Sequence, residues 1–264
     1  MDWWPIYLLT GLVVGFIAGM LGLGGGVVLV PLLVFLFSAQ RFPAAHVLQL
    51  ALGTSLASIV FTSLSGVRAH HRRGAVRWDI VRDAAPALVL GTLLGALVAG
   101  QLPSRYLAIV FVLFVTYAAA QMFSDSKPKP SRTLPKPPGL WAAAGSVGLI
   151  SSLAGTGGGI VMIPLMTWCN VPLRNAIGTS SALLLPIAVA GALGYMWTGL
   201  GKDHLPAYSV GYVYLPALVG LVIGTLITVP WGARAAHHMP VWWLRKIFAV
   251  VAFALAAKML LQLL

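Results

Sequence analysis

Long apolar stretches alternate with short polar segments along the whole chain. In the first half the apolar stretches run from about Trp4 to Phe37, Ala45 to Val67, Ile80 to Gly100 and Tyr106 to Phe123. The last three are close to the roughly 20 residues that a helix needs to cross a bilayer, and none shows the alternation of barrel strands. The pattern predicts an all-α integral membrane protein.

The first apolar stretch is too long for one straight span, and glycines interrupt it at Gly22 to Gly26. Three consecutive glycines permit positive φ and remove side chains from around the backbone, and Pro31 limits how far a regular helix continues. The part after the glycines, Val27 to Phe37, is only about 16 Å long as a helix, or half a hydrocarbon core. We therefore expect the helix to break here and to continue as a discontinuous or re-entrant element.

The glycine segment Gly22 to Pro31 occurs again, 133 positions later, as Gly155 to Pro164. In the same order, Gly53-Thr54-Ser55 is matched by Gly178-Thr179-Ser180. Further landmarks also repeat: Pro86, Gly91 and Gly95 match Pro216, Gly220 and Gly224. These repeats predict two homologous membrane halves, residues 1–123 and 140–264, joined at 124–139 by a linker rich in proline and lysine.

The number of crossings in each half decides how the two halves are oriented. If each glycine segment belongs to one crossing, each half has four spans, the halves are parallel, and the loop Lys and Arg residues divide 10 to 6 between the two sides. If each glycine segment is a hairpin or two crossings, the halves are inverted repeats and the same residues divide 13 to 3, the three being Arg41, Arg105 and Lys202. Because Lys and Arg concentrate in cytoplasmic loops, the inverted arrangement is favoured, with the linker cytoplasmic and both termini outside.

Composition narrows the classes of function. Apolar residues make up 59% of the chain and charged residues 8%, which suits a protein in contact with lipid. The excess of 17 Lys and Arg over 5 acids does not indicate a nucleic-acid partner, because the bases lie in short loops between apolar stretches. The single cysteine, Cys169, excludes an internal disulfide and a cysteine metal cluster.

Catalytic motifs are absent from the sequence. The chain has no Glu, its five Asp residues lie at a terminus, in loops or at span ends, and no nucleophile elbow or phosphate loop occurs. The adjacent pairs His70-His71 and His237-His238 lie beside basic residues without nearby acids, so we interpret them as interfacial histidines rather than metal ligands. We expect a protein that is not an enzyme and that holds no metal and no cofactor.

The glycine segments have features that favour binding of an anion. A helix that restarts after a break points free N–H groups and the positive end of its dipole into the membrane, and glycines let a ligand approach that backbone. The Gly-Thr-Ser triplets can add hydroxyl donors or be local helix breaks themselves; alternatively, hydroxyls and small residues only let helices pack, which we prefer for Gly91, Gly95, Gly220 and Gly224. The predicted substrate-binding residues are Gly24, Gly25, Gly26, Val27, Thr54 and Ser55 in the first half and Gly157, Gly158, Gly159, Ile160, Thr179 and Ser180 in the second.

A basic segment, Arg68 to Arg77, follows the second apolar stretch and is expected to be a loop. Arg68, Arg72 and Arg73 are predicted to set the orientation and to bind lipid headgroups. Their positive potential can also collect anions at the cytoplasmic mouth. The partners that the sequence predicts are therefore membrane lipids and a small anionic substrate.

Three features together resemble the TauE/SafE sulfite exporter family, also called TSUP: the paired Gly-x-Gly-Gly-Gly-x4-Pro segments, the paired Gly-Thr-Ser triplets, and His71 to Val76. The resemblance covers essentially the whole chain. It implies export of sulfite, sulfoacetate or related anions across the bacterial inner membrane. The second half departs from the first, because it carries Trp197-Thr198-Gly199 where the first carries His71-Arg72-Arg73-Gly74. A proton-coupled importer of an organic anion and a non-transporting membrane assembly protein remain alternatives.

Overall fold

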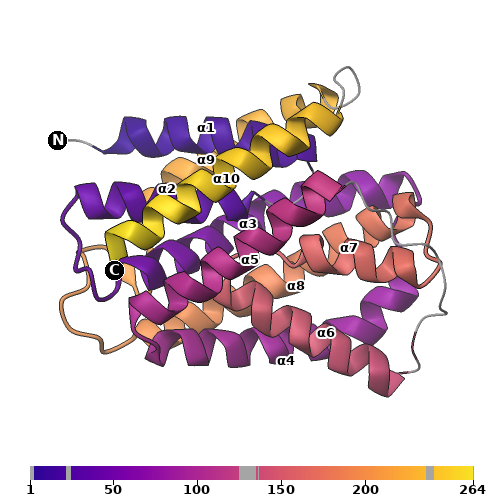
Figure 1. Cartoon of the computed structure of the whole chain (residues 1–264), viewed down its shortest axis with the longest axis horizontal. Coiled ribbons are helices and arrows are strands. Elements are labelled where there is room, and N and C mark those ends of the chain that lie inside the picture. Colours follow the sequence, from indigo (N-terminus) through magenta and orange to yellow (C-terminus); the bar gives the residue numbers. More distant parts are fainter. Residues whose placement is uncertain (1–2, 22–24, 125–134, 136, 236–240, 264) are drawn as a thin grey trace.

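The computed structural model describes residues 3–21, 25–124, 135, 137–235 and 241–263 (Figure 1). Within these residues the chain forms ten helices and one short hairpin of two strands. The helices are α1 (Trp4–Leu21), α2 (Gly26–Ala39), α3 (Val47–Arg72), α4 (Trp78–Gln101), α5 (Ser104–Ser124), α6 (Pro137–Leu153), α7 (Gly159–Trp168), α8 (Leu173–Gly199), α9 (Leu215–Ala235) and α10 (Val241–Leu263). The strands are β1 (Ser209–Val210) and β2 (Val213–Tyr214), which pair antiparallel.

Both glycine segments interrupt the helix, as predicted. The first separates α1 from α2 and the second separates α6 from α7. The helices α2 and α7 have 14 and 10 residues, which correspond to about 21 and 15 Å and are too short to cross a hydrocarbon core of roughly 30 Å. Among the described residues, α3, α4, α5, α8 and α9 each contain a stretch long and apolar enough to cross a membrane.

The chain reverses direction at the first break. Gln40, just beyond the end of α2, donates a hydrogen bond from Nε2 to the hydroxyl oxygen of Tyr7, near the start of α1. The rings of Tyr7 and Phe37 also meet edge to face, with their centroids 6.4 Å apart. The end of α2 therefore lies beside the start of α1, so that α2 returns toward the level at which α1 began.

Two expectations about local structure are wrong. The helix α3 continues through Arg72, so Arg68 and the pair His70-His71 lie on its last turns rather than in a loop. Cationic side chains are favourable at a helix C-terminus because they face the negative end of its dipole. Neither Gly-Thr-Ser triplet breaks its helix, since α3 and α8 run through residues 53–55 and 178–180 without interruption.

Each half contributes its first helix to the other half. The helix α1 packs along α9, and α6 packs along α4, while α3 lies against α8 between these two pairs (Figure 1). Glycines make the first two contacts close: a Cβ on Gly91 would lie 2.0 Å from the carbonyl oxygen of Gly145, and one on Gly224 would lie 2.6 Å from that of Leu8. The structure confirms the packing interpretation of these glycines.

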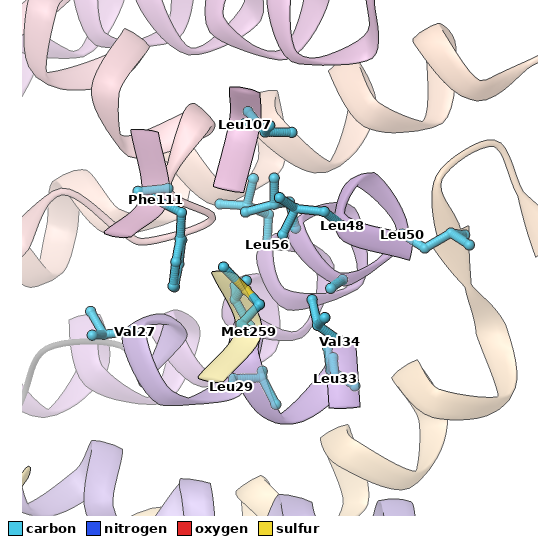
Figure 2. Close-up of a cluster of buried hydrophobic side chains, with 14 of the residues drawn as sticks. Val27, Leu29, Leu33, Val34, Leu48, Leu50, Leu56, Leu107, Phe111 and Met259 are labelled. Carbon is cyan, nitrogen blue, oxygen red and sulfur yellow. The ribbon is translucent and has the colours of Figure 1, made fainter. Parts of the chain in front are cut away.

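The largest apolar cluster joins elements of both halves. Figure 2 shows side chains from α2, α3, α5 and α10 that meet in it, among them Leu29, Leu56, Phe111 and Met259. All four are buried. Other large apolar side chains face outward, for example Leu113 and Trp197, which are 66% and 72% exposed. Such an outer surface is expected where lipid replaces water.

Candidate functional site

The residues that precede α2 and α7 have the same backbone conformation. Gly25 precedes α2 with φ 72° and ψ −9°, and Gly158 precedes α7 with φ 71° and ψ −6°. This left-handed region is costly for residues with a Cβ and free for glycine. The third glycine of each triplet, Gly26 or Gly159, is then the first residue of the new helix. Gly24 lies outside the described residues.

A second glycine ends the helix before the second break. Gly155 has φ +58°, and its N–H donates to the carbonyl of Ser152 over 3.2 Å. The N–H of Thr156 donates to the carbonyl of Ser151 over 3.0 Å. This pair of bonds is the Schellman motif, which satisfies the last carbonyls of a helix. Gly155 therefore ends α6, and Gly158, three residues later, precedes the start of α7.

The start of α7 leaves backbone donors available. The N–H groups of Val161 and Met162 both bond to the carbonyl of Gly158, at 3.1 and 2.9 Å. In the described part of the chain, the N–H groups of Gly159 and Ile160 have no backbone acceptor. Free N–H groups and the helix dipole attract anions at such a position.

The two breaks touch each other inside the protein. A Cβ on Gly26 would lie 2.4 Å from the carbonyl oxygen of Gly155 and 3.1 Å from the Cα of Thr156. The hydroxyl of Ser55, on α3, donates a buried hydrogen bond to the same Gly155 carbonyl over 3.1 Å. Predicted residues of the first half, Gly26 and Ser55, are thus brought together with the second glycine segment.

The Gly-Thr pairs have a role that the sequence did not reveal: each holds an extended segment of the other half. The hydroxyl oxygen of Thr54 accepts from the N–H of Tyr214, and that of Thr179 accepts from the N–H of Arg77, both over 3.0 Å. The adjacent glycines allow the same segments to approach: Cβ atoms on Gly53 and Gly178 would lie 2.4 and 2.5 Å from the carbonyl oxygens of Tyr212 and Ala75. Both threonines are completely buried.

The remaining predicted residues are buried. Val27 and Ile160 are buried, and Ser180 is 4% exposed on α8. A Cβ on Gly157 would overlap the side chain of Leu184 on α8. In this structure α8 therefore packs tightly against the second break.

Three polar side chains near the second break were missed by the sequence reasoning. The hydroxyls of Ser151, Ser152 and Thr156 are buried and have no hydrogen-bond partner in the described part of the protein. Hydroxyls in these helices usually bond to the carbonyl four residues earlier, as Ser146 does at 2.9 Å to Ala142. A buried hydroxyl without a partner costs about 1–3 kcal/mol, so each of these positions calls for an explanation such as a ligand. Ser151 lies beside Gly158, whereas Ser152 lies against Gly95 of α4.

A comparison of the two halves in the sequence could have pointed to these three hydroxyl residues. Displaced by 133 positions, the three hydroxyl residues correspond in sequence to Ala18, Gly19 and Leu23. The surroundings match as well: a Cβ on Gly25 would meet the side chains of Ala18 and Val14, and one on Gly158 would meet those of Ser151 and Val147. Gly25 and Gly158 thus have corresponding neighbours, but the first half has no hydroxyl at the positions that carry one in the second half.

The predicted mouth residues lie far from the breaks. Arg68, Arg72 and Arg73 are exposed, and Arg72 lies about 25 Å along α3 from Ser55 at 1.5 Å per residue. Arg174, at the start of α8, donates to the backbone carbonyl of Arg73 over 2.8 Å. These arginines can influence the approach of an anion but do not touch the glycine site.

The opposite end of α3 carries further polar groups. Nδ1 of His46 lies 3.4 Å from the hydroxyl oxygen of Tyr212. Burial lowers the pKa of His46, and the charges of Lys202 and His204 lower it further. The described acids, Asp79, Asp83 and Asp203, are all exposed. The described residues therefore place no carboxylate beside the breaks, and His237-His238 and most of the 124–139 linker lie outside them.

Comparison with known proteins shows the family to which the chain belongs. The family described as "Sulfite exporter TauE/SafE" matches residues 7–259. A "Probable membrane transporter protein" of Haemophilus influenzae is 35% identical over 257 residues, covering 97% of each chain. The Bacillus subtilis "Probable membrane transporter protein YdhB" is 30% identical over 249 residues, covering 89% of this chain and 91% of its own. A Methanocaldococcus jannaschii relative with the same description is 25% identical over 97% of this chain and 95% of its own. No solved structure matches.

Proposed function

Because the chain belongs to the sulfite exporter TauE/SafE family of membrane transporters, we propose that it exports small sulfur-containing or organic anions, such as sulfite, sulfoacetate or related sulfonates. The protein is a multi-pass membrane protein. The membrane that it occupies is, in this proposal, the bacterial inner membrane. Transport is by alternating access and is driven by the membrane potential.

The observation that carries the proposal is the contact between the two glycine breaks. Gly26 and Gly155 belong to corresponding segments of the two halves, and their backbones meet inside the protein. Discontinuous helices in corresponding positions of two repeats are where secondary transporters bind substrate. The free N–H groups at the start of α7 give this point the polarity that an anion requires.

The proposed mechanism treats the halves as inverted repeats. Five helices in each half, the reversal at the first break and the exchange of α1 and α6 between the halves support this arrangement. Movement of one half relative to the other around the meeting breaks would expose the site first to one side and then to the other. Because Leu184 and Ile187 pack against Gly157 and Gly158, a shift of α8 would open the second break.

The energetics favour export. A potential that is negative inside expels a monovalent anion with about 2.3 kcal/mol per 100 mV, or roughly 50-fold in concentration. Proton- and sodium-coupled carriers usually place an acid near the bilayer centre. The exposure of Asp79, Asp83 and Asp203 is consistent with a mechanism that needs no coupling ion.

Flux measurements in liposomes test the proposal. The purified chain is reconstituted, and efflux of sulfite, thiosulfate, sulfoacetate or taurine is followed at imposed potentials and, separately, with a pH gradient at zero potential. We expect flux of a sulfur oxyanion that rises with potential. Flux driven only by the pH gradient would favour a proton-coupled importer, and no flux of any anion would favour an assembly protein.

A further inference from the structure

The two breaks differ in the side chains around them. Beside Gly158 lies the hydroxyl of Ser151, close enough that a Cβ on Gly158 would be 2.8 Å from Ser151 Oγ. Beside Gly25 the corresponding atom is the methyl group of Ala18, at 3.0 Å from the equivalent Cβ position. Gly158 therefore has a hydroxyl beside it where Gly25, in the same backbone conformation, has a methyl group.

We propose that the anion binds at the second break alone, held by the N–H groups of Gly159 and Ile160 and by the hydroxyls of Ser151 and Thr156; Ser152 faces Gly95 of α4 and is not part of the site. This inference rests on the proposed function and names its binding site. The two hydroxyls are an observation independent of the helix terminus, because they are buried without partners. Ser151, which points at the residue preceding α7, connects the two sets of donors.

The environment strengthens these donors. Val147 and Ile187 border the same point, since their side chains lie within 3.3 Å of the Cβ position at Gly158. Apolar neighbours exclude water, and hydrogen bonds to an anion are stronger where water is excluded. Each side chain of the cluster can donate one proton, and the Thr156 and Ser151 backbones are already paired in the end of α6.

The chemistry of the donors selects a class of ligand. Every Lys or Arg whose exposure the structure describes has an exposed or half-exposed side chain, so the charge of a bound anion is met by neutral donors and a helix dipole. Such a site suits a monoanion, because each further charge would need a buried counter-charge. Two hydroxyls and two backbone N–H groups suit a head group with several oxygen acceptors, such as a sulfonate or hydrogen sulfite. The ligand class is therefore a small singly charged oxyanion of sulfur.

The asymmetry has a consequence for stoichiometry. In the sequence, Ala18 and Leu23 of the first half correspond to Ser151 and Thr156, so these first-half positions carry no hydroxyl. One anion then binds per protein in each cycle.

Single substitutions at the hydroxyls test the site, with the full-length protein in detergent and in liposomes. The substitutions are Ser151→Ala and Thr156→Val, with Thr156→Ser as the conservative variant and Ser146→Ala as the control. Ser146 lies on the same helix, is exposed, and bonds to its own helix. The measurements are the thermal unfolding midpoint in sodium sulfite, sodium methanesulfonate or sodium chloride at equal ionic strength, and the apparent KM for sulfite flux.

Ser151→Ala and Thr156→Val should each raise the KM about tenfold, since a hydrogen bond to a charged group is lost. Both should lose most of the midpoint shift that sulfite produces, with an equal or higher midpoint in chloride, because an unpaired buried hydroxyl destabilises the empty protein. Thr156→Ser and Ser146→Ala should behave as the parent chain does.

Two results would overturn the inference. Parent-like KM and sulfite shifts in both variants would show that the hydroxyls do not contact the anion. A lower midpoint in chloride with unchanged KM would show that they are structural. If the parent chain carries sulfite while the variants are unaffected, only the binding site is wrong; if the parent chain shows neither flux nor a shift with any oxyanion, the proposed function fails as well.

Discussion

The hydroxyl of Ser55 on α3 donates a hydrogen bond to the carbonyl of Gly155 across 100 positions of sequence, over 3.1 Å and out of contact with solvent. Gly155 is the residue whose left-handed backbone ends α6. A side chain of the first half thus holds the turn on which the second break depends. The bond couples the proposed substrate site to the interface between the halves.

Replacement of Ser55 by Ala should lower the free energy of unfolding by about 1–3 kcal/mol, because the Gly155 carbonyl loses a buried donor. Thermal or denaturant unfolding in detergent measures the loss. The control is Ser63→Ala on the same helix, whose hydroxyl bonds only to the carbonyl of Val60 at 2.8 Å and is also buried. Equal effects of the two substitutions would contradict a special role for Ser55.

Alanine at Gly25 or Gly158 should abolish or strongly reduce anion flux. The left-handed conformation costs a residue with a Cβ roughly 1–2 kcal/mol, and the new methyl group would press on Ala18 or on Ser151. Flux assays in liposomes measure the effect, with folding checked by circular dichroism. Gly66→Ala is the control, since that glycine lies within α3 and its Cβ would meet nothing within 4 Å. Parent-like flux in both break variants would refute the site.

Valine at Thr54 or Thr179 should destabilise the protein by about 1–3 kcal/mol, because each substitution leaves a backbone N–H, of Tyr214 or Arg77, without its acceptor. Serine at either position keeps the acceptor and should restore most of the stability. The corresponding change Thr198→Val removes only a bond within α8 and should cost less. Thermal midpoints of these variants provide the comparison. Unchanged midpoints in both valine variants would mean that the extended segments do not depend on these bonds.

Neutralisation of the arginines at the end of α3 should slow anion capture without altering the site. The substitutions Arg68→Gln, Arg72→Gln and Arg73→Gln, combined, should raise the KM for flux from that side at low salt. The difference should shrink near 0.15 M salt, where screening acts within about 8 Å. Arg105→Gln is the control, because Arg105 is exposed at the start of α5. A KM difference that does not depend on salt would indicate direct contact with the anion.

Much of the fold can be read from local sequence. The expected short helix Val27 to Phe37 lies within α2, and the breaks fall where glycines permit a left-handed backbone. These features depend on interactions between near neighbours, which the sequence contains directly. The end of α3 was misjudged by several residues because cationic side chains mark a helix C-terminus as readily as a loop.

The candidate site was predicted only in part. The duplicated segments identified both breaks, and Gly26 and Ser55 lie where the two halves meet. The hydroxyl of Thr156 could have been noticed as a polar position opposite Leu23 of the first repeat, whereas nothing local distinguishes Ser151 from Ser146. One is buried without a partner and the other is exposed and bonded to its own helix.

The sequence alone determined that the chain is a duplicated helical membrane protein, because hydrophobic length, glycine conformation and repeat spacing are properties of contiguous residues. Only the tertiary structure decided what each polar group bonds to. The partners of Thr54 and Thr179 come from segments about 100 positions or more away. A hydrogen bond forms only within about 3 Å, and which backbone reaches that distance is settled by how the helices of the two halves pack.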